Sequence, residues 1–128
     1  DLGRVAEKRG DDAEAERLYL AALTGDVKRD GDVHLALGNF YQRLGNREKA
    51  IRHWRQALEG DLASDQHLVT AQRLSDMLRE AGRPVAMVKS VLMTAIGRHP
   101  HAREAQILRS RLEALAEPKR ANGANPLA

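Results

Sequence analysis

The side chains of this sequence that could do chemistry do not form a recognisable reaction centre. Five histidines are the first candidates for metal ligands, but His34, His53 and His67 fall on separate predicted helices. A zinc site needs three or four converging ligands, and the chain has no cysteine and no two histidines four residues apart. We therefore expect no metal and no cofactor. His99 and His101 are expected near a helix end and a helix start.

Carboxylates are the next candidates, as general acids or bases, but they gather where a helix should begin. Asp11, Asp12, Glu14 and Glu16 occupy such a start, where acidic side chains complement the helix dipole. The sequence also lacks a glycine-rich phosphate loop and a nucleophile elbow. We therefore expect that the chain is not an enzyme.

Composition sets further bounds. The 128 residues suit one domain, and 21 basic against 18 acidic residues give a net charge of only +3. No apolar run approaches the ~20 residues of a membrane span. The Ala- and Arg-rich composition suggests a bacterial source. The sequence does not decide the cellular compartment, although the cytoplasm is slightly favoured. The opening at Asp1, without methionine or an apolar leader, suggests a part of a larger chain or assembly.

The elements that must position these side chains are helices. Strong helix formers dominate, and apolar residues recur every three or four positions between breaks of glycine followed by Asp, Asn or Pro. This pattern predicts helix pairs over residues 2–9 and 13–23, 33–44 and 47–58, and 64–81 and 84–97, and one unpaired helix over 101–117. Residues 118–128 have no periodicity and are predicted to form a flexible tail.

The helices repeat with a fixed period of 35 residues. The landmarks Leu2, Gly3, Gly10, Ala15, Tyr19 and Ala22 return as Leu37, Gly38, Gly45, Ala50, Trp54 and Ala57. A third set, shifted by two or three residues, includes Leu74, Gly82, Leu92 and Ala95. Such a period is typical of a solenoid, whose usual role is to offer a surface to a partner. We predict repeats at about 1–30, 31–63 and 64–100 in a domain over 1–117, closed by a capping helix at 101–117.

The second repeat resembles the tetratricopeptide repeat. It has the Leu37-Gly38 pair, Tyr41 three residues on, the turn glycine Gly45, and then Ala50, Trp54 and Ala57. The first repeat matches with Ala6 in place of Tyr41, and the third has Ser75 in place of the packing glycine. The resemblance implies an all-α, right-handed superhelix of antiparallel helical hairpins that acts as a non-catalytic interaction scaffold.

Residue size agrees with such hairpins. Gly3, Gly38 and Ala50 are small where two helices of a pair would cross, and their backbones could approach closely. Tyr41 and Trp54 are large, and we expect them to fill space between repeats.

The first helix of each pair should line the concave groove of such a superhelix. Residues of these helices that packing does not use are Arg4, Lys8, Leu35, Asn39, Gln42, Arg43, Gln72, Arg73, Asp76 and Arg79. The set is mildly basic, which favours an acidic peptide or a carboxylate of a protein partner, although a solvated polar face would show the same charges. Asn39 is the foremost candidate, because an amide can both donate to and accept from a peptide backbone.

The clamp that some members of this family use to hold the C-terminal carboxylate of chaperone tails is mostly missing. Where that clamp requires two asparagines, this chain has Arg4 and Ala36. We therefore do not expect chaperone-tail binding.

Two other functions stay open from the sequence. The helix over 84–97 is apolar nearly all round, with Val85, Met87 and Met93 among its residues, so it is either buried or available for self-association. Single-stranded RNA binding is the second alternative. The low net charge and the acidic residues Glu7 and Asp76 on the groove side count against RNA.

Overall fold

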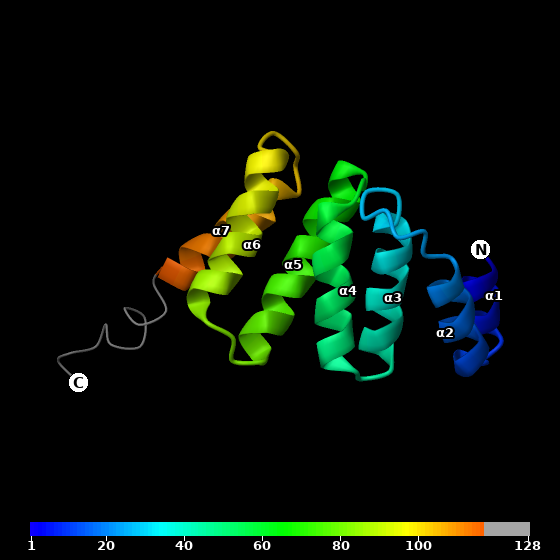
Figure 1. The fold of residues 1–128 in the computed structure, drawn as a ribbon. Helices are drawn as coiled ribbons and strands as arrows, with labels where there is room; N and C mark the ends of the chain where they lie inside the picture. The colour runs from blue at the N-terminus through cyan, green and yellow to red at the C-terminus, as the bar shows by residue number, and fades with distance from the viewer. Residues whose placement is uncertain (117–128) are drawn as a thin grey trace. The chain divides into compact units, whose positions relative to one another are not determined.

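The computed structural model describes residues 1–116 and folds them into seven α-helices with no strand (Figure 1). In chain order these are α1 (Leu2–Lys8), α2 (Asp12–Ala21), α3 (Gly31–Arg43), α4 (Arg47–Glu59), α5 (Ser64–Glu80), α6 (Val85–Arg98) and α7 (Ala105–Ala116). The expected all-α class is confirmed. The tail expected at 118–128 lies outside the described residues.

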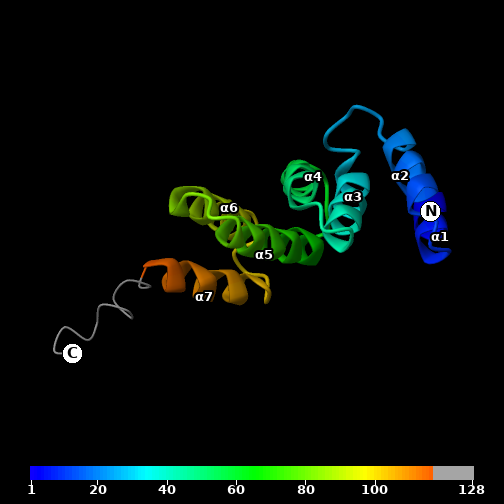
Figure 2. The ribbon, with the colours of Figure 1, turned by 90° about the horizontal axis from the view of Figure 1, so that it is seen from below.

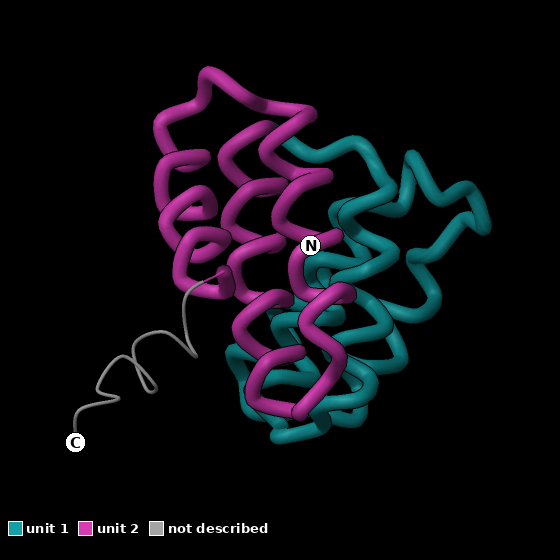
Figure 3. The backbone as a smooth tube through the Cα atoms, turned by 90° about the vertical axis from the view of Figure 1, so that its left-hand side faces the viewer, with its two compact units in different colours: residues 1–63 teal, residues 64–128 magenta. Residues whose placement is uncertain are grey.

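The chain divides into two compact units, residues 1–63 and the residues from Ser64 onward (Figure 3). In the first unit α1 packs on α2, α3 packs on α4, and α2 contacts α3. Figures 1 and 2 show each of the two pairs as an antiparallel hairpin. In the second unit α5 packs on α6, and α7 packs on both. The single domain over 1–117 and its right-handed superhelix stay predictions.

The first two hairpins turn in the same way. Gly10 and Gly45 both adopt positive φ, +81° and +80°, a backbone conformation that glycine adopts without steric cost. Each is followed by a residue whose side chain caps the next helix: Asp11 accepts a hydrogen bond from Glu14 N, and Asn46 accepts one from Lys49 N. The Gly-Asp and Gly-Asn pairs seen in the sequence are therefore helix stop and start signals.

Close helix crossing, as predicted, depends on Gly3 and Gly38. A Cβ on Gly3 would lie 2.6 Å from the Tyr19 ring, and one on Gly38 would overlap the Trp54 indole. Trp54 thus fills space inside its own hairpin. The sequence-based expectation had named only the space between repeats. Tyr41 does bridge two hairpins, because its hydroxyl donates to Glu16 Oε2 on α2 at 2.6 Å.

The connection between the hairpins is as long as predicted but lies two residues earlier, since α2 ends at Ala21 and α3 already begins at Gly31. Its last residue is Asp30, whose buried carboxylate accepts hydrogen bonds from Thr24 N, Thr24 Oγ1 and Gly25 N. Burial opposes ionisation of Asp30, but these hydrogen bonds outweigh it and hold its pKa below the usual value. The loop is therefore fixed by its own carboxylate.

The recurring Gly-Asp pairs at 25–26 and 60–61 are not conformational equivalents. Gly25 has φ +92°, whereas Gly60 is extended, with φ −90° and ψ 178°. Gly60 lies against the backbone of Gly31, and Asp61 N donates to Lys28 O at 2.9 Å. Position 60 requires glycine because the backbone of Gly31 lies close to it, and position 25 requires glycine because its φ is positive.

Gly60→Ala should therefore destabilise the first unit by about 1–3 kcal/mol. The new Cβ would lie 2.5 Å from Gly31 Cα and 2.9 Å from Val27 O, both backbone atoms that cannot rotate away. Gly97→Ala is the matched control, because a Cβ there meets nothing within 4 Å and alanine favours helix α6 by about 0.5–1 kcal/mol. Thermal denaturation followed by circular dichroism should show a lower Tm for the first variant and a higher one for the second. An unchanged Tm for Gly60→Ala would contradict the Gly31–Gly60 contact.

The third hairpin keeps the packing with different residues. Ser75 replaces the packing glycine and is fully buried, but its hydroxyl is satisfied by donating to Gln72 O at 2.8 Å. Leu92 replaces the large aromatic and is also fully buried. The final helix begins at Ala105 and not at residue 101, because residues 99–104 form turns after α6.

Candidate functional site

The first unit contains a cavity of about 460 Å³ between α1 and α3, which we call the α1–α3 pocket. Its lining residues are Arg4, Glu7, Lys8, Tyr19, Ala36, Asn39 and Arg43. Four of them, Arg4, Lys8, Asn39 and Arg43, belong to the groove residues predicted from the sequence.

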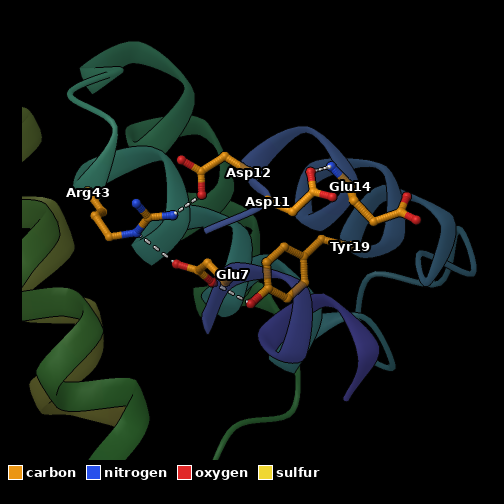
Figure 4. Close-up of polar contacts among 6 residues, drawn as sticks. All are labelled: Glu7, Asp11, Asp12, Glu14, Tyr19 and Arg43. Atoms are coloured by element: carbon orange, nitrogen blue, oxygen red, sulfur yellow. Dashed lines mark hydrogen bonds and ion pairs between the residues drawn. The ribbon is translucent and has the colours of Figure 1, made fainter. Parts of the chain in front are cut away.

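Arg43 is held by two carboxylates of the preceding hairpin. Its Nε donates to Glu7 Oε2 at 2.9 Å and its Nη2 donates to Asp12 Oδ1 at 2.7 Å, as Figure 4 shows. Hydrogen bonds to Asp12 and then Glu7 raise the pKa of Arg43. The guanidinium thus links α3 to the α1–α2 hairpin and fixes one wall of the pocket.

Glu7 is shared between Arg43 and Tyr19. The buried Tyr19 donates its hydroxyl hydrogen to Glu7 Oε1 at 2.6 Å (Figure 4). Burial, and then this hydrogen bond, raise the pKa of Tyr19 to about 12, so its hydroxyl stays protonated at neutral pH. The one acidic residue of the pocket is therefore engaged by a cation and a hydroxyl of the chain itself.

Arg4 and Lys8 are the more available cations. Arg4 is exposed, and its Nε lies 3.7 Å from Asp1 Oδ2, a loose and solvated pair. Lys8 is exposed and takes part in no ion pair within residues 1–116. Both side chains can reorient toward an anion without breaking a tight internal contact.

Asn39 is oriented by Trp54. The indole Nε1 donates to Asn39 Oδ1 at 3.1 Å, and because an indole N–H can only donate, the amide must face it with its oxygen. The opposite end of the half-buried amide is therefore its NH₂ end. The sequence did not indicate this link between the core and the pocket.

The other predicted groove residues lie elsewhere. Leu35 and Gln42 are on α3 but do not line the pocket, and Gln72 and Arg73 are on α5 of the second unit. Asp76 pairs with Arg111 Nη2 of α7 at 3.0 Å. A second cavity of about 460 Å³ is lined by Asp76, Arg79 and Glu80. A single groove that uses residues of both units stays a prediction.

The sequence did not reveal that two histidines meet. The Nδ1 atoms of His34 and His53 lie 3.0 Å apart, both rings are buried, and His53 also stacks on Tyr41 with ring centroids 5.5 Å apart. A separation of 19 residues gives no helical pattern, so only the antiparallel pairing of two helices could have indicated the contact. No group of three or more metal-binding side chains occurs within residues 1–116.

Two other histidines meet at the far end of the third hairpin. The rings of His67 and His99 pack edge to face at 5.0 Å, and Arg98 Nη1 lies 2.9 Å from His67 Nε2. Since a guanidinium only donates, His67 accepts at Nε2. His99 caps the end of α6, as predicted, whereas His101 lies in a turn and does not begin a helix.

Helix α6 is buried on one face only. Val88, Leu92 and Ala95 are buried, while Val85 and Met93 are 51% and 59% exposed. Self-association through this face stays a prediction. Among the helices of residues 1–116, none has the length and apolar character that crossing a membrane requires.

Comparison with known proteins gives two family matches in the first unit. Residues 1–32 and residues 31–59 each match a family model described as tetratricopeptide repeat. The matches coincide with the first two predicted repeats and with hairpins α1–α2 and α3–α4. No curated protein and no solved structure matches the chain.

Proposed function

The chain is a tetratricopeptide-repeat protein, and from this premise we propose that it binds an acidic segment of a partner protein in the α1–α3 pocket. Repeats of this family generally mediate protein–protein interaction and are typically non-catalytic. The pocket, its ligand and the absence of a reaction are our proposals.

The observation that supports an acidic ligand is the charge of the pocket. Its lining has three basic side chains, Arg4, Lys8 and Arg43, against the single carboxylate of Glu7. Because Arg43 already compensates Glu7, the charges of Arg4 and Lys8 are left for a ligand carboxylate. These two cations lie one helical turn apart on α1, and one carboxylate or two neighbouring ones could contact both.

The rest of the lining suits a peptide. A cavity of about 460 Å³ is within the range of roughly 300–1,000 Å³ that ligand pockets usually have. Ala36 is a small residue of the lining, and Asn39 adds a polar amide to it. Arg43 holds α3 against α1 and α2, so the pocket is largely formed before the ligand arrives.

Selection from a random peptide library on the immobilised protein tests the proposal. We expect the selected peptides to be rich in Asp and Glu. Their affinity should fall at least about ten-fold for Arg4→Glu/Lys8→Glu, because one charge-assisted contact is typically worth about 1.5–3 kcal/mol. Lys28→Glu/Arg29→Glu is the matched control, since it makes the same charge change in the exposed interhairpin loop outside the pocket.

Two results would contradict this function. One is a selection without acidic bias. The other is an equal loss of affinity in both variants, which would show that net charge and not the pocket attracts the peptides.

A further inference from the structure

The loop between the first two hairpins is closed on itself by hydrogen bonds. Residues 22–30, the interhairpin loop, join α2 to α3, and in Figure 2 the loop stands out from the ends of both helices. The Asp30 carboxylate at its end accepts hydrogen bonds from Thr24 N and Oγ1, at 2.9 and 2.7 Å, and from Gly25 N at 2.9 Å near its start. Compact surface loops whose ends meet in this way are frequently functional.

Further hydrogen bonds hold the middle of the interhairpin loop. Asp26 Oδ1 accepts from Lys28 N at 3.0 Å, and Asp26 N donates to Thr24 Oγ1 at 3.1 Å. Lys28 O accepts from Asp61 N at 2.9 Å, which ties the loop to the residues that follow α4. A loop whose backbone is already ordered loses little conformational entropy when a partner binds it.

The charged side chains of the loop differ in their surroundings. Asp26 and Asp30 both direct carboxylate oxygens at N–H groups of the loop backbone. Lys28 and Arg29 are exposed and take part in no ion pair within residues 1–116. Val27, the residue before them, is 41% exposed. The loop therefore presents one apolar side chain and two uncompensated positive charges to its surroundings.

We propose that Val27, Lys28 and Arg29, the loop face, bind an acidic surface of a folded partner protein, and that the hydrogen bonds of Thr24, Asp26 and Asp30 hold the loop in the shape that binds. The partner would offer carboxylates to the two cations and a shallow apolar depression to Val27. Charge-assisted hydrogen bonds are about twice as strong as neutral ones, and a guanidinium can meet one carboxylate with two parallel N–H donors.

Other classes of ligand fit the loop face less well. The interhairpin loop has no aromatic side chain on which a nucleic-acid base could stack. Anionic membranes are typically recognised by clusters of about four to eight basic residues, and this loop has only Lys28 and Arg29. The loop face is also separate from the proposed acidic-peptide site, because none of its three residues lines the α1–α3 pocket.

A displayed library of a small three-helix domain, with one face randomised, supplies folded probes for the test. Selection on the full chain should yield domains whose randomised face combines Asp and Glu with an apolar residue. Their affinity should fall at least about ten-fold for Lys28→Glu/Arg29→Glu, because two charge-assisted contacts are lost. It should be unchanged for Arg4→Glu/Lys8→Glu, the matched control, which makes the same charge change in the α1–α3 pocket.

A second variant tests whether the fixed backbone contributes. Thr24→Val keeps the shape of the side chain but removes the hydroxyl that donates to Asp30 and accepts from Asp26 N. We expect faster amide hydrogen exchange at Asp26 and about two- to ten-fold weaker binding of the selected domains, although both cations are retained. Full affinity despite faster exchange would contradict the proposed role of these hydrogen bonds.

Three results would overturn the loop face as a protein-binding site. The first is that no selected domain loses affinity in Lys28→Glu/Arg29→Glu, or that both charge variants lose it equally. The second is tighter binding of a polyuridine oligonucleotide, or of vesicles containing phosphatidylserine, that the loop variant abolishes. The third is a dimer of the chain in sedimentation that the same variant dissociates. None of these results bears on the α1–α3 pocket, which is tested with linear peptides and other cations.

Discussion

Replacing Trp54 with alanine should lower the free energy of unfolding of the first unit by roughly 3–5 kcal/mol. The indole is fully buried and occupies the space that Gly38 leaves open, so its removal creates a cavity between α3 and α4. It also removes the donor that orients Asn39. Urea denaturation followed by far-ultraviolet circular dichroism measures the change without relying on tryptophan fluorescence.

A matched truncation at the surface should have little effect. Leu44→Ala removes an apolar side chain that is 47% exposed, and we expect a change within about 0.5 kcal/mol. If Trp54→Ala cost no more than Leu44→Ala, the assignment of Trp54 as the packing centre of the second hairpin would be wrong.

The second large effect is a loss of stability in mild acid, caused by His34 and His53. Their Nδ1–Nδ1 hydrogen bond needs one N–H donor and one lone pair, so the pair cannot hold both rings protonated. Burial, and then the neighbouring His34, lower the pKa of His53 to about 4, from an ordinary value of 6.5. Burial also lowers the pKa of His34.

The direction in which stability changes with pH follows from these pKa shifts. A histidine whose pKa is lowered by folding binds its proton more readily in the unfolded chain, so stability falls as protons are added. The contribution is complete above pH about 6.5 and is lost as the pH falls toward about 4. At about 1.4 kcal/mol for each unit of pKa shift, the loss by that pH is about 2–3 kcal/mol.

The charged groups around the two histidines have opposite effects on protonation. Asp30 favours the protonated form of His34, whereas Arg52 and Lys49 disfavour protonation of His53. His53→Phe keeps a ring against Tyr41 but cannot titrate, so thermal unfolding of this variant should depend less on pH over this range. Equal pH dependence of the Tm in wild type and variant would rule out His53 as the source.

Much of the fold could be predicted because its signals are local. Gly10 followed by Asp11, and Gly45 followed by Asn46, mark a helix end and the next helix start within two residues. The small residue Gly38 and the large residue Trp54 define a helix crossing through size alone. Four of the residues predicted to line a groove do line the α1–α3 pocket, because helical spacing alone assigns them to α1 and α3 outside the repeat landmarks.

Other features depend on contacts between distant residues, which no local pattern reveals. No pattern of residues indicated that Arg43 would be held by Glu7 and Asp12, 36 and 31 residues away. The His34–His53 contact arises only from the antiparallel register of two helices.

The backbone conformation of Gly60 could not be predicted either, for a different reason. Gly60 follows Gly25 by the repeat period of 35 residues, yet Gly25 has a positive φ whereas Gly60 adopts an extended backbone against Gly31. The same residue type met two physical requirements, left-handed φ and close approach, which the sequence does not distinguish.

The most direct test of the central claim is to map where an acidic peptide binds. An acidic peptide from the library selection is titrated into the isotope-labelled protein while the amide chemical shifts are recorded. We predict saturable changes concentrated on Arg4, Lys8 and Asn39 around the α1–α3 pocket, and their loss in Arg4→Glu/Lys8→Glu. Changes confined to the second unit, for example around Val85 and Met93, would contradict the account.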